Sequence, residues 1–177
     1  FRLAPSPHDI GGCFCDKHRQ AFLKKHYYSD TQWDEMINAI NQRSLTPMLR
    51  AWLNDACDEL TACFRTQQQV LPPGRLGIMV MYLGAEKAGV RLNSYGDVPF
   101  RVGELMFEDA SFEPLKGKTD ELFSVLFHRR FASPELSYSE TTAFPSDRLS
   151  AANLAAKLNI SLIADVRNTM FMSGLTP

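Results

Sequence analysis

The chain has 177 residues, of which 45% are hydrophobic, enough apolar side chains for one ordinary core. Its 19 basic residues are balanced by 20 acidic ones without a dense Lys/Arg cluster, which argues against nucleic acid as a partner. The apolar runs stop far short of the roughly twenty residues that cross a membrane, so no membrane span is expected. We therefore expect a single domain over residues 1–177.

Helical patterns dominate the first third of the chain. The first predicted helix runs from Cys13 to Tyr28, and Ser29 can cap a second helix that carries apolar residues at helical spacing from Trp33 to Ile40. A third helix is predicted from about Thr46 to Gln67, where a wide apolar stripe repeats over the whole length. These three helices are expected to form one layer of the domain.

Strand patterns begin after Pro72-Pro73-Gly74, which interrupts the helical spacing. Short apolar runs at 76–83, 90–93 and 100–108 are separated by turn residues. The connections between them are too short for parallel crossovers, so the pattern predicts an antiparallel meander.

The last third mixes both kinds of element. We predict a helix from Thr119 to Phe131, a strand at 136–142, a short helix at 148–158 capped by Ser146, and a final strand at 160–166. The predicted fold class is α+β, with N-terminal helices packed on an antiparallel sheet of four or five strands. The expected core residues are Trp52, Leu53, Leu60, Phe64, Ile78, Val80, Tyr82, Leu105, Phe107 and Phe127.

Cys13 is the leading candidate for chemistry. It follows Gly11-Gly12 at the predicted start of a helix, where the positive end of the helix dipole stabilises a thiolate. The glycines would let a substrate approach the backbone. The functional interpretation is a cysteine nucleophile, and the alternative is a small apolar residue that happens to begin a helix.

A thiolate nucleophile needs a base and an orienting acid. His18 lies five residues after Cys13 in the same predicted helix and therefore on another face, which leaves His128 as the distant base. Glu108, at the end of a predicted strand, is the candidate acid. The alternatives are an exposed histidine on a polar helix face for His128 and a charge that opens a turn for Glu108.

The cysteines at positions 13, 15, 57 and 63 allow several interpretations. Cys13, Cys15 and His18 could offer zinc ligands, but their C-x-C-x2-H spacing lacks the usual paired knuckle, so no metal or other cofactor is predicted. Cys57 and Cys63 are interpreted as small apolar residues of the third helix. Because a core of this size does not need disulfides, four free thiols are expected.

A family resemblance adds to these expectations. The segment 106–113, followed by 119–123, resembles the strand and helix around the catalytic acid of the YopT-type papain-like cysteine proteases, and Gly12-Cys13 is similar to the nucleophile site of that family. The resemblance implies a papain-like fold, with Glu108 as the acid and the base near residues 87–90, where this chain has no histidine.

Two functions follow from these patterns and from the resemblance. The first is a cysteine hydrolase or acyltransferase, in the family a bacterial effector that acts on a protein substrate. The alternative is a non-catalytic interaction domain that binds a protein partner, such as an effector, an adaptor, an immunity-type protein or a degenerate protease relative. Either function is compatible with a cytoplasmic location or with secretion into a host cell.

Overall fold

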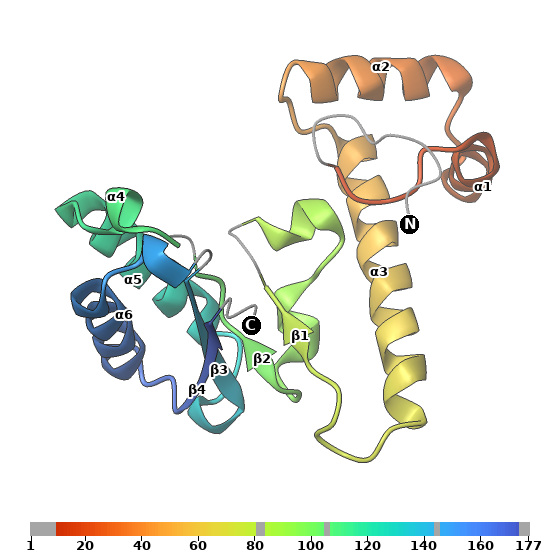
Figure 1. The fold of residues 1–177 in the computed structure, drawn as a ribbon. Coiled ribbons are helices and arrows are strands. Elements are labelled where there is room, and N and C mark those ends of the chain that lie inside the picture. Colours follow the sequence, from red (N-terminus) through yellow and green to blue (C-terminus); the bar gives the residue numbers. More distant parts are fainter. Residues whose placement is uncertain (1–9, 81–83, 105–106, 144–145, 174–177) are drawn as a thin grey trace. The chain divides into compact units, whose positions relative to one another are not determined.

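The computed structural model describes residues 10–80, 84–104, 107–143 and 146–173. The chain divides into two compact units: unit 1 is Phe1–Thr66 with Gly84–Arg91, and unit 2 is Gln67–Leu83 with Leu92–Pro177. Unit 1 is built from helices, and unit 2 combines helices with a sheet (Figure 1). The mixture of helix and sheet confirms the coarse α+β prediction, whereas a papain-like fold and a single domain stay predictions.

Unit 1 contains α1 (Asp16–His26), α2 (Asp30–Asn41) and most of α3 (Pro47–Gln69), so the three predicted helices are confirmed. Local residues set their ends. Tyr27 adopts a left-handed backbone conformation (φ 59°) that ends α1, and Ser29 forms a reciprocal capping box with Gln32 at the start of α2.

An aromatic cluster forms the centre of unit 1. The rings of Trp33 and Trp52 lie 5.3 Å apart in an edge-to-face arrangement, and Phe22 packs edge-on against Trp52 at 5.1 Å. The prediction that Leu60 belongs to the core is wrong, because this residue is 45% exposed. At 23 residues, α3 is about twice as long as α1 or α2, and its buried residues all lie between Met48 and Cys57.

Unit 2 contains a four-stranded sheet in the order β1-β2-β3-β4, with every neighbouring pair parallel. Its strands are β1 (Ile78–Met79), β2 (Phe100–Arg101), β3 (Ser137–Ala143) and β4 (Asn168–Ser173). The predicted antiparallel meander is therefore wrong. Its central strand at 90–93 does not form, since Leu92–Tyr95 is a 3-10 helix, and the longer connection from β1 to β2 allows a parallel crossover.

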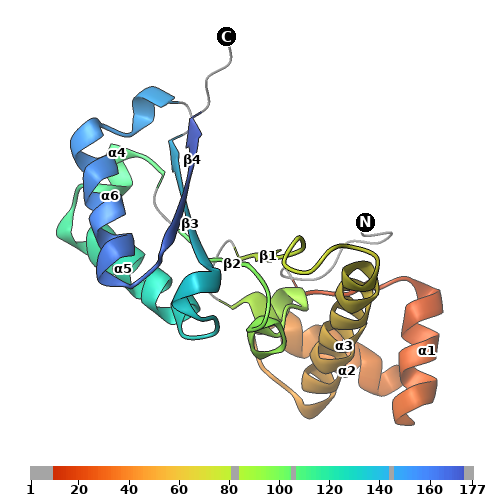
Figure 2. The same cartoon turned by 90° about the horizontal axis from the view of Figure 1, so that it is seen from below.

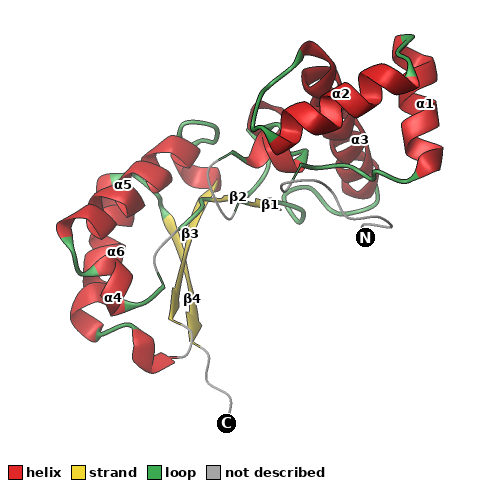
Figure 3. Cartoon of the chain, turned by 90° about the horizontal axis from the view of Figure 1, so that it is seen from above, coloured by secondary structure: helices red, strands yellow, loops and turns green. Residues whose placement is uncertain are grey.

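Among the described residues, three α-helices lie wholly within unit 2: α4 (Asp109–Phe112), α5 (Leu115–Arg129) and α6 (Ala151–Ile163). In Figures 2 and 3, α5 and α6 lie on one face of the pair β3 and β4. Parallel crossovers are right-handed, and here each one leads to the next strand in the same direction. Successive connections that turn the same way place their helices on the same face.

Two predicted boundaries in unit 2 are wrong. The strand expected at 160–166 is largely the end of α6, and the chain reverses at Asp165, whose backbone is left-handed (φ 54°). The side chain of Ser150, not that of Ser146, caps α6 by accepting a hydrogen bond from the backbone of Asn153. In the same way α5 begins at Leu115, four residues before the expected Thr119.

The remaining core predictions divide into three groups. Trp52 and Val80 are buried as expected. Tyr82 and Leu105 lie outside the described residues. The partly buried ones are Leu53, Phe64, Ile78, Phe107 and Phe127.

Candidate functional site

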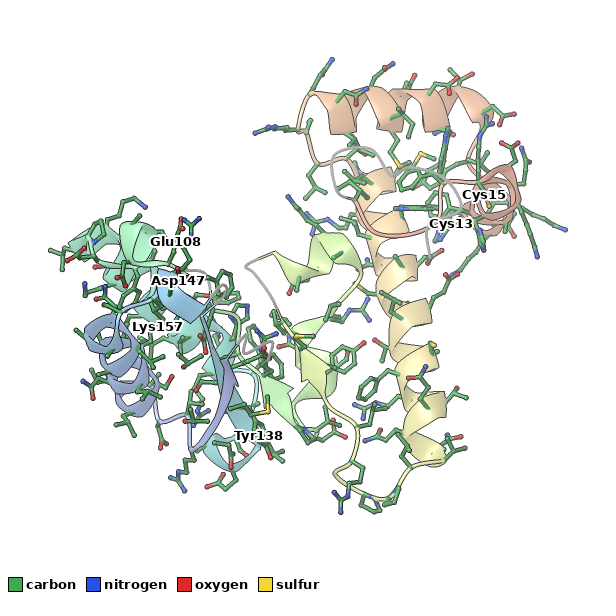
Figure 4. All side chains as sticks on the ribbon, in the orientation of Figure 1. Cys13, Cys15, Glu108, Tyr138, Asp147 and Lys157 are labelled. Carbon is green, nitrogen blue, oxygen red and sulfur yellow. The ribbon has the colours of Figure 1, made fainter. Side chains whose placement is uncertain are left out.

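Two cysteines and a histidine come together where α1 begins (Figure 4 labels the cysteines). The sulfurs of Cys13 and Cys15 and a ring nitrogen of His18 all lie within 4.8 Å of one another, and each residue is partly buried. Cys15 Sγ lies 3.0 Å from His18 Nδ1. The expectation that His18 lies on another face than Cys13 is wrong, because α1 starts at Asp16 and both cysteines precede it.

The residue between the two cysteines anchors this segment. The ring of Phe14 packs 4.8 Å from Trp52 and 5.7 Å from Trp33, measured between centroids. The sulfurs of the two cysteines that flank Phe14 lie within 4.8 Å of each other. Trp52 Nε1 also donates a hydrogen bond to the carbonyl of Gly11 at 2.9 Å. The thiols are therefore held by a rigid aromatic support.

A pocket of about 100 Å³ adjoins the cluster. Cys13 and His18 line it together with the apolar rings of Phe22 and Trp52. Its charged lining residues are Lys25, Asp55 and Glu59. The pocket therefore combines a thiol, an imidazole, charged groups of both signs and an apolar surface.

Asp55 organises the charges beside this pocket. Its carboxylate accepts a hydrogen bond from Lys25 Nζ at 2.9 Å and lies 2.9 Å from His26 Nε2. Partial burial raises the pKa of Asp55, but the hydrogen bonds from Lys25 and His26 outweigh burial and hold that pKa below its usual range. The same contact raises the pKa of Lys25, so the two groups form an ion pair at neutral pH.

The other two cysteines lie on α3. Cys57 is 3% exposed, and burial raises the pKa of its thiol. This environment agrees with the prediction of a small apolar residue. Cys63 is exposed instead. None of the four cysteines, all within the described residues, forms a disulfide, and the free thiols stay a prediction.

The structure places the other two predicted catalytic residues in unit 2. His128, on α5, is completely buried, and its Nδ1 accepts a hydrogen bond from the backbone of Gly103 at 3.2 Å. The alternative of an exposed His128 is therefore wrong. Glu108 is the N-cap of α4, and one of its carboxylate oxygens lies 3.4 Å from Arg148 Nη1. Their catalytic roles with Cys13 stay predictions.

Sequence reasoning missed a buried charged network in unit 2. Lys157 of α6 is 2% exposed, and its Nζ lies 2.6 Å from Glu121 of α5 and 3.3 Å from Glu104, which follows β2. The lysine stands at helical spacing with Asn153 and with Ile160, which are also buried. That spacing was a detectable signal, but a lysine in such a position is normally assigned to solvent.

No described helix combines the length and apolar character needed to span a membrane. Comparisons of the chain with protein-family models, curated proteins and solved structures give no match.

Proposed function

We propose that unit 1 is the site of a cysteine-dependent hydrolase or acyltransferase that acts on a protein substrate. Cys13 is the nucleophile and His18 is the base. The observation that carries the proposal is that both residues line one pocket, with a ring nitrogen of His18 within 4.8 Å of the sulfur. This separation is within reach of one bridging water or a small side-chain rotation.

The proposed chemistry has two steps. His18 takes the proton of Cys13 as the sulfur attacks a substrate carbonyl, and it returns that proton to the leaving group as a thioester forms. Water or an acceptor amine then attacks the thioester, again losing a proton to His18, and the thiol is restored. The N-terminus of α1 lies beside the sulfurs, and its exposed N–H groups favour negative charge there.

Several observations support the choice of His18. It lies in the same unit as Cys13, whereas His128 belongs to unit 2 and has no exposed surface. In this proposal His18 therefore takes the role that the first sequence interpretation gave to His128. The resemblance to the YopT-type proteases supports a further part of the proposal, that the chain is an effector whose substrate is a host protein.

Alkylation rates test this assignment without a known substrate. The reduced protein is treated with limiting iodoacetamide in the presence of a chelator, and peptide mass spectrometry follows each cysteine separately. We expect Cys13 to react at least about tenfold faster than the exposed Cys63, and His18→Ala to remove that advantage. Cys15→Ser should leave Cys13 fast. A rate for Cys13 that equals that of Cys63, or that His18→Ala does not change, contradicts the proposal.

A second candidate function is supported by the face of the unit 2 sheet opposite α5 and α6. A groove of about 300 Å³ there is lined mainly by apolar side chains, among them Met79, which is 59% exposed, and Met170, which is 43% exposed. Tyr138, labelled in Figure 4, lines the same groove. Exposed methionines suit an adaptable protein-binding surface, as a non-catalytic interaction domain would need. That function needs no reactive thiol, so the alkylation experiment separates the two candidates.

A further inference from the structure

The cluster at the start of α1 contains the donor set of a zinc site. Thiolate sulfur and imidazole nitrogen are the ligands that Zn²⁺ prefers in proteins, and Cys13, Cys15 and His18 supply two sulfurs and one nitrogen. We propose that these three residues bind one Zn²⁺ ion, and that the fourth coordination position opens onto the pocket that Cys13 and His18 line.

The distances fit tetrahedral coordination. Zinc–sulfur bonds of about 2.3 Å and zinc–nitrogen bonds of about 2.0 Å place two sulfurs about 3.8 Å apart and a sulfur and a nitrogen about 3.5 Å apart. The contact of 3.0 Å between Cys15 Sγ and His18 Nδ1 and the upper limit of 4.8 Å for the whole cluster bracket these values. Movements of about 1 Å or less in side-chain atoms bring the three ligands to bonding positions.

The surroundings hold the ligands in place before a metal binds. Phe14 anchors the segment between the two cysteines, since its ring packs against both Trp33 and Trp52. The carbonyl of Gly11 accepts a hydrogen bond from Trp52 Nε1. His18 lies in the first turn of α1 and so keeps a constant spacing from Cys15. Ligands held in this way lose little conformational freedom on binding.

Charge and coordination number also agree with zinc. Binding forms two Zn–S bonds and one Zn–N bond and releases two thiol protons to solvent, so the two thiolates offset the charge of the metal. Structural zinc sites have four protein ligands, whereas sites with three leave one position for water or a ligand. Among the described residues, three such donors gather here, so the site leaves one coordination position for water or a ligand.

Zinc would also regulate the thiol, and this consequence alone rests on the proposed function. A sulfur bonded to zinc is a weaker nucleophile than a free thiolate, so zinc binding slows the chemistry of Cys13 and removal of zinc restores it. The same three residues thus have two exclusive states, one metal-bound and one reactive.

Metal titration of the reduced, metal-free full chain tests the site. Co²⁺ is added first, because its absorption reports thiolate ligation and tetrahedral geometry, and Zn²⁺ is then added in competition with a chromophoric chelator. We expect one ion per chain. Cys13→Ser, Cys15→Ser and His18→Ala should each weaken Zn²⁺ binding by more than about 100-fold, whereas the matched control Cys63→Ser should have no effect.

Two further measurements keep the outcome clear. His18→Cys should retain the Co²⁺ thiolate bands, since it replaces one zinc ligand by another, and Trp fluorescence shows whether each variant has folded. Binding that persists in both cysteine variants, or that is lost equally in Cys63→Ser, overturns the zinc site.

Alkylation in the presence and absence of Zn²⁺ then tests regulation, and a bound ion should slow labelling of Cys13 by more than about tenfold. Metal binding without a fast thiol in chelator disproves the proposed function alone, and a fast thiol without metal binding disproves the zinc site alone.

Discussion

Gly12 supports the candidate site through its lack of a side chain. Its backbone has φ 102°, and a Cβ atom there would lie 2.9 Å from the nearest ring carbon of Trp52. Gly74 also has a positive φ, of 74°, but nothing lies within 4 Å of its hypothetical Cβ. Both glycines therefore have a positive φ that disfavours other residues, but a side chain would clash with a neighbour only at Gly12.

This difference leads to a prediction at the scale of a residue. Gly12→Ala should destabilise unit 1 by about 2 kcal/mol or more, because it adds a clash with Trp52 to the backbone strain, whereas Gly74→Ala should cost only about 1 kcal/mol. Urea unfolding followed by far-UV circular dichroism measures both variants. Equal losses would show that the packing of Gly12 against Trp52 has no energetic role.

The residue scale also shows how far the sequence alone could identify the site. The position of Cys13 beside the start of a helix was predicted from Gly11-Gly12. The closeness of His18 to Cys13 was not predicted, because the predicted helix began at Cys13, whereas α1 begins at Asp16. The rotation of about 100° per residue holds only inside a helix, so applying it to Cys13, which precedes α1, wrongly placed Cys13 and His18 on different faces.

At the scale of elements, the buried network joins three parts of unit 2. Lys157 links α6 to α5 through Glu121 and to the segment after β2 through Glu104. Burial raises the pKa of Glu104 to about 7, although the charges of Lys157 and Arg101 lower it, and Glu121 adds to the increase. The folded protein therefore binds a proton at Glu104 more tightly than the unfolded chain does.

This shift predicts a pH dependence. The contribution of Glu104 to the free energy of unfolding is fully present below about pH 4.5 and is lost as pH rises through about 7, a change of about 3 kcal/mol. Glu104→Gln mimics the protonated form and should make the dependence flatter between these pH values. Urea unfolding followed by far-UV circular dichroism tests this, with the exposed Glu113→Gln as control. Identical pH profiles for Glu104→Gln and the native protein would contradict the shift.

Helices were easier to predict than strands for a physical reason. The apolar stripe of α3 repeats from Met48 to Phe64, so its period is clear, whereas β1 and β2 have only two residues each. A strand of two residues has no alternation to detect. The direction of the strands depended on the segment 90–93, and once that segment is no strand, the antiparallel prediction has no support.

At the scale of the whole molecule, the two units are interleaved along the chain. Unit 1 includes Gly84–Arg91, which lies between the sequences of β1 and β2 in unit 2. This segment joins unit 1 through Arg91, whose guanidinium is paired with Asp58 of α3 at 2.5 Å. No single cut of the chain therefore separates one unit from the other.

The interleaving predicts cooperative unfolding. Both tryptophans, Trp33 and Trp52, belong to unit 1, so their fluorescence reports on that unit, whereas far-UV circular dichroism reports on both. We expect the two signals to give the same urea midpoint. The segment Gly84–Arg91 belongs to unit 1 while both of its ends continue into unit 2, so unfolding of one unit removes a constraint on the other. Separate midpoints would show two independently folding units and would contradict the single-domain prediction.

The order of the strands has a consequence for biosynthesis. Along the sheet, β1, β2, β3 and β4 lie in the order in which they leave the ribosome. Each new strand pairs at the free edge of the one before it, and none has to be inserted between strands that are already paired. Unit 2 can therefore assemble its sheet stepwise during translation, with each intermediate exposing one growing edge.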